Sequence, residues 1–285
     1  MELKNVHNRL RWLANLNKVL HLTSLLQGPD QASRVIPRHV GIIMDGNGRW
    51  ARSRFMPRIW GHKRGANSVR EVVKAAASSG VQVLSLFAFS DENWGRPVEE
   101  VTALMGLFDH YLSYEISELM RQNIKLRVMG NLDRLPERTK KLLVQGCEEL
   151  SSCTGMVLNL AVSYGARAEI TEAVRNIAQQ IREGLIDPEH VNEDLFASHL
   201  ATAGLPDLDL VIRTSGEQRL SNFMLWQSSY AELHFTKVHW PDFSASDFDK
   251  AVHEFSSRQR RFGLVDQVIN DLTITSDPGA GEASC

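Results

Sequence analysis

The sequence has little cysteine and no long apolar run. Only Cys147, Cys153 and Cys285 occur among the 285 residues, and their spacing fits neither a disulfide framework nor a metal site. Such a set indicates reduced thiols. No apolar stretch reaches the length of a transmembrane helix, and the N-terminus lacks the apolar core of a secretory signal. These absences predict a cytoplasmic protein.

An excess of charge of one sign is also absent. The chain carries 32 Lys and Arg residues against 34 Asp and Glu residues, which gives a net charge of −2. The molecule as a whole is therefore not an electrostatic match for nucleic acid. A small polyanionic substrate would have to be met by a local cluster of basic side chains.

The two ends of the chain differ from the rest. Residues 1–27 place apolar side chains at steps of three and four among basic ones, with Glu2 as the only acid, which predicts a basic amphipathic helix. Such a helix packs on its own domain or on a partner subunit, lies on an anionic membrane, or belongs to a plastid transit segment. We expect an N-terminal extension over residues 1–36 and a disordered tail over residues 264–285.

Apolar runs and amphipathic stretches alternate between these ends. The predicted strands are residues 39–44, 81–89, 125–129, 156–162, 208–212 and 233–238. The predicted helices are residues 65–79, 97–123, 136–150, 166–183 and 246–261. This alternation is typical of an α/β fold, with an open, mostly parallel sheet that carries helices on both faces.

Unusual polar residues follow three of the strands, in segments 45–50, 90–96 and 213–222. In parallel α/β sheets the carboxyl ends of the strands meet at one edge, where ligands bind. We therefore expect the three segments to lie together.

The first segment has the composition of an anion site. Gly46 and Gly48 allow the backbone to approach a ligand, and Arg49 adds a bidentate donor. The alternative is an ordinary glycine-rich turn with solvated basic residues. Asp45 fits two roles from sequence alone: it could cap a helix, or hold Mg²⁺ against a diphosphate.

The third segment gathers Arg213, Arg219, Ser221 and Asn222. Two guanidinium groups and a hydroxyl suit a second diphosphate. The alternative is a surface network of salt bridges with Glu217.

Four strings in the chain closely resemble the cis-prenyltransferases, and most of all the undecaprenyl diphosphate synthases. They are residues 39–50 (HVGIIMDGNGRW), 87–97 (FAFSDENWGRP), 212–227 (IRTSGEQRLSNFMLWQ) and 230–235 (YAELHF). The resemblance spans residues 37–263, which would form the catalytic domain. It implies a homodimer with an internal hydrophobic tunnel between the sheet and its helices.

The resemblance also implies roles for individual residues. The allylic diphosphate would be held by Gly46, Asn47, Gly48, Arg49, Arg58 and His62, with Trp50 as a further substrate-binding residue. Isopentenyl diphosphate would be held by Arg213, Arg219 and Ser221. The turn that closes over the reacting centre would comprise Ser90, Asn93, Trp94 and Arg96, with Asn93 assigned to proton removal. The Mg²⁺ ligands would be Asp45, also catalytic, and Glu232.

The implied reaction condenses isopentenyl diphosphate with an allylic diphosphate (farnesyl, geranyl or dimethylallyl) and forms a new cis double bond. Ala88 is small at a position bordering the tunnel, and the chain lacks an insertion of the dolichol type between Ser90 and Met156. Both features favour a medium-chain product such as undecaprenyl diphosphate. Two alternatives remain: a short-chain synthase of neryl-, farnesyl- or lavandulyl-type diphosphate, and a non-catalytic partner subunit.

Two positions in the chain depart from the family pattern, and its C-terminal motif matches it. Residues 163–167 (SYGAR) stand where Asn-Tyr-Gly-Gly-Arg is common, and Asp91 stands where Ser or Thr is common. Both lie beside the predicted site and remove no group that the chemistry needs. Residues 261–263 (RFG) match the family's Arg-x-Gly ending, which can reach a neighbouring subunit's site, but also suit a plain helix end.

Overall fold

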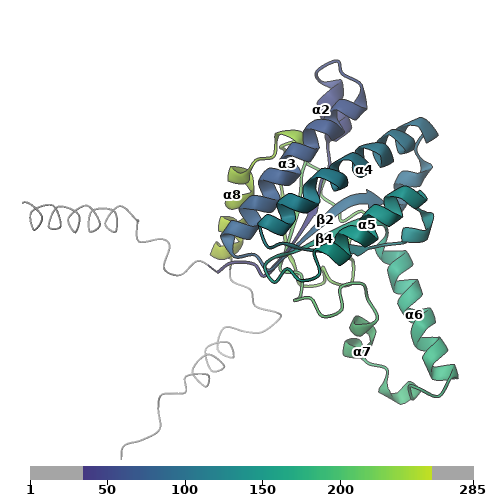
Figure 1. The fold of residues 1–285 in the computed structure, drawn as a ribbon. Helices are drawn as coiled ribbons and strands as arrows, with labels where there is room; N and C mark the ends of the chain where they lie inside the picture. Colours follow the sequence, from purple (N-terminus) through teal and green to yellow (C-terminus); the bar gives the residue numbers. More distant parts are fainter. Residues whose placement is uncertain (1–34, 259–285) are drawn as a thin grey trace, which may run out of the picture. The chain divides into compact units, whose positions relative to one another are not determined.

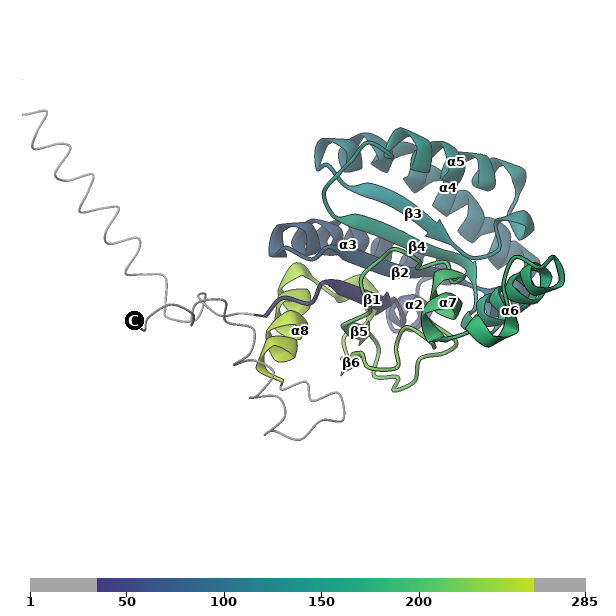
Figure 2. The same cartoon turned by 90° about the horizontal axis from the view of Figure 1, so that it is seen from below.

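A six-stranded sheet forms the centre of the computed structural model, which describes residues 35–258 (Figures 1 and 2). The strands are β1 (His39–Ile43), β2 (Val83–Ser90), β3 (Lys125–Met129), β4 (Val157–Tyr164), β5 (Leu210–Arg213) and β6 (Glu232–Phe235). Their order is β3-β4-β2-β1-β5-β6, and every neighbouring pair is parallel. The predicted α/β architecture is confirmed.

Helices follow β1, β2, β3, β4 and β6, whereas no helix lies between β5 and β6. The helices are α2 (Asn47–Arg52), α3 (Arg58–Ser79), α4 (Val98–Arg121), α5 (Glu137–Glu149), α6 (Ala166–Arg182), α7 (Glu193–Ser198) and α8 (Ala245–Ser257). Helices α8, α3, α4 and α5 pack over one face of the sheet (Figure 2). On the other face, the start of α6 and the irregular segments 200–209 and 214–231 cover a smaller apolar cluster.

The pleat of the strands separates these two cores. In β1, Val40 and Ile42 join the larger cluster, whereas Ile43 belongs to the smaller one. Gly41 also points toward the smaller cluster, where an added Cβ would lie only 3.0 Å from the Phe223 ring. Burial on both faces explains why the strands read as continuous apolar runs instead of alternating ones.

The helix α3 begins at Arg58, seven residues earlier than predicted. The first two turns of α3 contain Gly61 and Gly65, and glycine is unfavourable inside helices. The structure shows a reason for Gly61: a Cβ there would lie 1.9 Å from the Asn47 carbonyl oxygen. The glycine therefore permits close contact between α3 and the first segment. The short helices α2 and α7 were not predicted.

Several predictions fall outside the described residues. These are the N-terminal helix over residues 1–27, the tail over residues 264–285 and the RFG ending at residues 261–263. Within residues 35–258, no helix has the length and apolarity that crossing a membrane would need.

Candidate active site

The three polar segments meet where β1 runs between its two neighbours, β2 and β5. Segments 45–50, 90–96 and 213–222 all leave the sheet at the carboxyl ends of these strands. This position is a topological switch point, because the chain continues to β2 on one side of β1 and returns as β5 on the other. The sheet topology alone therefore brings the predicted residues together.

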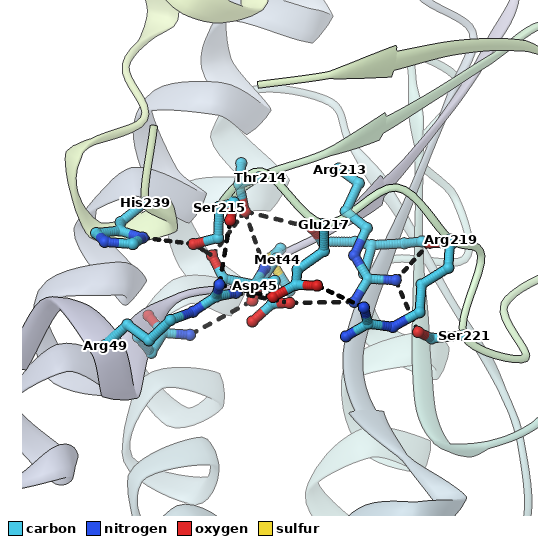
Figure 3. Close-up of polar contacts among 12 residues, drawn as sticks. Met44, Asp45, Arg49, Arg213, Thr214, Ser215, Glu217, Arg219, Ser221 and His239 are labelled. Carbon is cyan, nitrogen blue, oxygen red and sulfur yellow. Dashed lines mark hydrogen bonds and ion pairs between the residues drawn. The ribbon is translucent and has the colours of Figure 1, made fainter. Parts of the chain in front are cut away.

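The Asp45 carboxylate lies between two guanidinium groups (Figure 3). Its Oδ2 is 3.1 Å from Arg49 Nη2 and 3.1 Å from Arg213 Nη2. Burial alone would raise the pKa of Asp45, but the hydrogen bond from Arg213 and the charge of Arg49 hold it below its ordinary value. Gly46 is the N-cap of α2 and no side chain caps that helix, so Asp45 does not act as a helix cap.

The backbone of Asp45 is held from β5 and its following turn. The Thr214 and Ser215 hydroxyls donate to the Asp45 carbonyl at 2.7 and 3.1 Å, and the Trp240 N–H donates to it at 3.0 Å. Gly46 follows in the left-handed region, with φ of 106°, and an added Cβ would lie 1.9 Å from Ser215 Oγ. Only glycine fits this position.

Glu217 joins two of the predicted arginines. Its carboxylate is 2.7 Å from Arg49 Nη1 and also pairs with Arg219. The salt-bridge network considered as the alternative therefore exists, but Arg213 is only 4% exposed and does not belong to a surface network. Arg213 donates to Ser221 Oγ at 2.7 Å and to the Arg219 carbonyl, and its Nε has no partner among the described residues.

A second cluster stands at the starts of α3 and α4. Glu100 lies 3.4 Å from Arg58 and 3.2 Å from Arg96. His62 is beside them, and burial, together with the charges of Arg96 and Arg58, lowers its pKa to about 4. The neutral ring has a buried Nε2 without a hydrogen-bond partner among the described residues. This cluster can offer two cations and a neutral imidazole to an anion.

Both clusters border one cavity of about 890 Å³. Its polar end is lined by Asp45, Gly46, Asn47, Gly48, Arg49, Arg58, His62, Asn93, Arg96, Glu217 and Arg219. Its apolar part runs between the sheet and the helices α3 and α4, and is lined by Leu86, Ala88, Leu104, Met105, Phe108, Leu112, Leu119, Leu126, Leu158 and Leu160, among others. The cavity thus combines an anion-binding end with a long apolar body.

The predicted turn over the reacting centre is only partly in the cavity wall. Asn93 lines the cavity, and its Oδ1 accepts a hydrogen bond from the Ser90 N–H at 3.2 Å, within a reciprocal capping box. Trp94 instead donates to Ser163 Oγ at 2.9 Å, and Trp50 donates to Asp242 at 2.7 Å. Neither indole is among the residues that line the described cavity. Ser90 therefore positions Asn93, and the two tryptophans support the turns.

The structure does not bring Glu232 to Asp45. Glu232 is paired in register with Leu210, which is paired with Val40, so it lies level with the start of β1. Asp45 comes five residues later, which is about 16 Å along the strand direction. The Glu232 carboxylate binds Arg258 at 2.8 Å instead. Within one chain, the expected pair of Mg²⁺ carboxylates does not form, because the two residues leave opposite ends of the sheet.

Asp45 alone still fits a magnesium ion that arrives with a diphosphate. The lowered pKa keeps the carboxylate ionised, and only its Oδ2 makes hydrogen bonds to other described residues. No group of three or more His, Cys, Asp or Glu side chains suited to a metal occurs within residues 35–258. Mg²⁺ commonly takes one or two carboxylates and completes its shell with phosphate oxygens and water.

Sequence reasoning missed the residues that hold the cations in place. Glu100 pairs with both arginines of the second cluster, and Thr214 and Ser215 fix the backbone of Asp45. Glu100 stands four residues after Arg96, but Arg96 precedes α4, so the spacing rule for ion pairs on a helix face does not apply to this pair. Thr214 and Ser215 carry no sequence signal either, since their role depends on the pairing of β5 with β1.

Comparison with known proteins gives consistent matches. The prenyltransferase family model, which describes undecaprenyl diphosphate synthases, matches residues 43–263. A ditrans,polycis-undecaprenyl-diphosphate synthase of Vibrio vulnificus, described as (2E,6E)-farnesyl-diphosphate specific, is 47% identical over 247 residues, which is 87% of this chain and 98% of the relative.

Two solved structures share the architecture. Lavandulyl diphosphate synthase from Lavandula x intermedia, solved with dimethylallyl diphosphate, matches with a TM-score of 0.79 and 37% identity, over 80% of this chain and 98% of that chain. A probable undecaprenyl diphosphate synthase from Campylobacter jejuni matches with a TM-score of 0.66 and 32% identity, over the same shares of the two chains.

Proposed function

The chain belongs to the cis-prenyltransferase family that includes the undecaprenyl diphosphate synthases, and on this basis we propose that it condenses isopentenyl diphosphate with an allylic diphosphate. Each condensation would add five carbons and one cis double bond. One observation carries the proposal: two clusters of arginines converge at the polar end of a single cavity whose body is apolar.

For the binding of two diphosphates, we divide the arginines of both clusters into two groups, one on each side of Asp45. Arg49, Arg58 and Arg96 lie with His62 around the helix starts of α2 and α3, where backbone N–H groups also attract phosphate. Arg213, Arg219 and Ser221 lie on the other side of Asp45. We assign the first group to the allylic diphosphate and the second to isopentenyl diphosphate. Glu217 pairs with Arg49 and Arg219, and Glu100 pairs with Arg58 and Arg96. A bound diphosphate would replace these carboxylates as the partner of the arginines.

The reaction then depends mainly on charge stabilisation and positioning. The cations of the first group stabilise the negative charge that grows on the leaving diphosphate as the allylic C–O bond breaks. The electron pair of the isopentenyl double bond forms the new C–C bond with the allylic carbon, and a proton leaves C2. Asp45 would hold Mg²⁺, which neutralises diphosphate charge when it is bound. The fixed pose of the two substrates makes the new double bond cis.

Asn93 is better suited to orient a substrate than to remove the proton. Its amide oxygen accepts from the Ser90 N–H and the residue lines the cavity, so its amide N–H donors are the groups left to bind a substrate. A neutral amide is also a poor base. We therefore assign proton acceptance to a diphosphate oxygen of the bound substrates.

The cavity body favours a medium-chain product. The apolar wall of α4 extends from Leu104 to Leu119, which is about 22 Å along the helix. A ten-carbon prenyl chain spans less than half of this length. The volume of about 890 Å³ also lies near the top of the usual range for small-molecule sites, about 300–1,000 Å³. We propose that this cavity is the tunnel for a growing polyprenyl chain such as undecaprenyl diphosphate.

A short-chain product is the second candidate, because one structural match is a lavandulyl diphosphate synthase. A non-catalytic partner subunit is disfavoured. Asp45, Arg49, Arg213 and Arg219 are all present and in contact with one another or through Glu217, as the reaction requires.

Further parts of the proposal concern assembly and location. We propose a homodimer that forms through the sheet edge at β6, where Tyr230 and Leu233 are exposed beside a strand edge that pairs with no further strand of residues 35–258. We also propose a cytoplasmic location with peripheral membrane contact, since the substrate and product chains are lipids.

The decisive experiment incubates the purified full-length chain with MgCl₂, labelled isopentenyl diphosphate and farnesyl diphosphate, and separates the products by chromatography. We expect incorporation into a medium-chain polyprenyl diphosphate. No incorporation with any allylic primer would refute the catalytic proposal. A ten- or fifteen-carbon product would refute only the assignment of chain length.

A further inference from the structure

The connection between α2 and α3, together with the first turn of α3, exposes three large apolar side chains. Phe55 is 99% exposed, and Met56 and Trp60 are exposed as well. Every residue from 52 to 58 is exposed, and this connection forms the upper extremity of the domain in Figure 1. We call residues 52–64 the α2–α3 tip. Apolar side chains that gather on a surface, unlike scattered single ones, mark an interaction site.

Neither packing nor backbone conformation accounts for Phe55. Its φ is 57°, in the left-handed region that disfavours residues other than glycine and asparagine. Its ring is almost completely in solvent, so it contributes nothing to the core. Glycine would serve the turn better on both counts. A large aromatic ring in a strained and solvated position indicates that something outside the described residues contacts it.

The charge of the tip limits what that contact can be. The tip contains five basic residues (Arg52, Arg54, Arg58, Lys63 and Arg64) and no acidic one. Three of them, Arg52, Lys63 and Arg64, make no ion pair within residues 35–258. The Lys63 ammonium lies over the Trp60 ring, 4.9 Å from its centroid. Apolar rings interleaved with unpaired cations match a surface that is anionic outside and apolar beneath.

We propose that the α2–α3 tip docks the protein on an anionic lipid bilayer. Phe55, Met56 and Trp60 enter the boundary between headgroups and acyl chains, as aromatic side chains do at membrane interfaces, while the three cations without an ion pair bind lipid phosphates. Arg52 and Arg58 also line the cavity, so docking places the polar mouth of the cavity at the lipid surface. This inference rests on the proposed function, because a prenyl chain is what would pass between cavity and bilayer.

The test is flotation of the full-length protein with vesicles of phosphatidylcholine alone, or of phosphatidylcholine with about one third phosphatidylglycerol. The test variant is Phe55→Gly/Trp60→Ser. Glycine adopts the left-handed conformation of residue 55 without strain, so this variant should not destabilise the turn. The matched control is Val174→Ser/Leu185→Ser, which removes two exposed apolar side chains on and after α6, away from the tip.

We expect wild type and control to bind the anionic vesicles, and the test variant to lose about tenfold or more in partitioning. Raised salt should weaken binding of all three proteins. Binding of the test variant equal to wild type would overturn the inference, whichever other segment carries the binding. Equal binding to neutral and anionic vesicles would overturn it too. So would a tip-dependent change in oligomeric state without vesicles, which would assign the tip to a protein partner.

The same samples should be assayed for isopentenyl incorporation with a short, water-soluble allylic diphosphate in vesicle-free buffer. We expect equal turnover of the wild type and both variants, since no substituted residue lines the cavity. Loss of turnover confined to the tip variant would overturn a role restricted to docking. Absence of turnover in the wild type would refute the proposed function separately, without deciding the vesicle result.

Discussion

The Thr214 hydroxyl contacts the backbone of Asp45 twice. It accepts a hydrogen bond from the Asp45 N–H at 2.9 Å and donates one to the Asp45 carbonyl at 2.7 Å. Thr214 is fully buried, so no water competes for these bonds. The end of β5 thereby fixes the end of β1, and with it the carboxylate that lies between Arg49 and Arg213.

Thr214→Val should therefore lower turnover without unfolding the protein. Valine has nearly the same shape but removes two hydrogen bonds. The Asp45 N–H keeps the Ile43 carbonyl as a partner, and the Asp45 carbonyl keeps Ser215 and the Trp240 backbone N–H, so the loss should be about 0.5–1.5 kcal/mol per bond. Small displacements of a reacting group are costly, so we expect about a tenfold or greater loss of kcat. Thr214→Ser keeps the hydroxyl and is the control. Equal kcat for the valine and serine variants would show that the contact does not position Asp45.

Asp45→Ala should abolish most turnover. The variant loses the carboxylate proposed to hold Mg²⁺, and we expect a loss of roughly 10²–10³-fold in kcat. The sequence alone gave no reason to expect a change in stability. The structure does, because Arg213 is buried and loses one of its partners, at a cost of about 1–3 kcal/mol in the free energy of unfolding.

Asp242→Ala is the matched control for that measurement. Asp242 is a carboxylate near the same edge of the sheet, but it binds Trp50 and Arg54 instead of the cavity residues. Its removal should leave kcat close to that of the wild type. Wild-type activity in Asp45→Ala, measured over a range of Mg²⁺ concentrations, would refute the metal role.

The sequence was sufficient for the order and type of the main elements, because apolar periodicity and turn residues both report local structure. It was also sufficient for the convergence of Asp45, Arg49, Arg213 and Arg219, since parallel strands place their ends at one edge. It was insufficient where a residue acts on a distant segment. The predicted helix began only at residue 65, whereas α3 begins at Arg58 and Gly61 within it permits the close contact with Asn47.

The same limit explains the residues that sequence reasoning placed poorly. Whether an indole points into a cavity depends on packing, and Trp94 turns instead to Phe89 and Ser163. The position of Glu232 depends on the register between β5 and β6, which cannot be deduced from one amino-acid sequence. The carboxylate that holds Arg58 and Arg96, Glu100, is recognised only when the tertiary contacts are known.

Two buried histidines should make the protein less stable in mild acid. Burial lowers the pKa of His39, and burial with the nearby charges of Arg96 and Arg58 lowers that of His62 to about 4. The unfolded chain, with histidine pKa values near 6.5, then binds more protons than the folded one. Stability from these groups is complete above about pH 6.5 and is lost as the pH falls toward about 4.

Urea unfolding at several pH values between about 7.5 and 4 would measure this dependence. His62→Gln removes one of the two groups and should flatten the slope of unfolding free energy against pH in that window. The carboxylates with lowered pKa values, such as Asp45, act mainly at lower pH. An unchanged slope in His62→Gln would mean that His62 does not contribute.

Ala88→Leu should shorten the product. Ala88 lies on β2, is half-buried and lines the cavity, so a larger side chain would occupy space proposed for the growing chain. Overpacking should cost no more than about 1–3 kcal/mol. The control is Ala77→Leu, at a half-buried position on α3 outside the lining of the described cavity. Products of unchanged length in Ala88→Leu, separated by chromatography, would contradict the assignment of the cavity as the tunnel.

Gly46→Ala should lower both the stability of the fold and the activity of the site. Comparison with a second glycine distinguishes the effect of backbone strain from the effect of a steric clash. Gly46 has a φ of 106°, and a Cβ there would lie 1.9 Å from Ser215 Oγ and 2.8 Å from His239 Nδ1. Gly184 also has a positive φ, 72°, but nothing lies within 4 Å of its would-be Cβ. Gly184→Ala should therefore cost only the conformational strain, about 1–2 kcal/mol, and leave kcat unchanged.

Gly46→Ala carries the strain and the clash together, so its free energy of unfolding should fall by clearly more than that of Gly184→Ala. Relief of the clash must move Ser215 or the Asp45–Gly46 peptide, and Ser215 holds the Asp45 carbonyl at 3.1 Å. Turnover should consequently fall even in the fraction that remains folded. Urea unfolding and kcat measured for both variants would test this, and equal losses for the two glycines would show that close packing at Gly46 is unimportant.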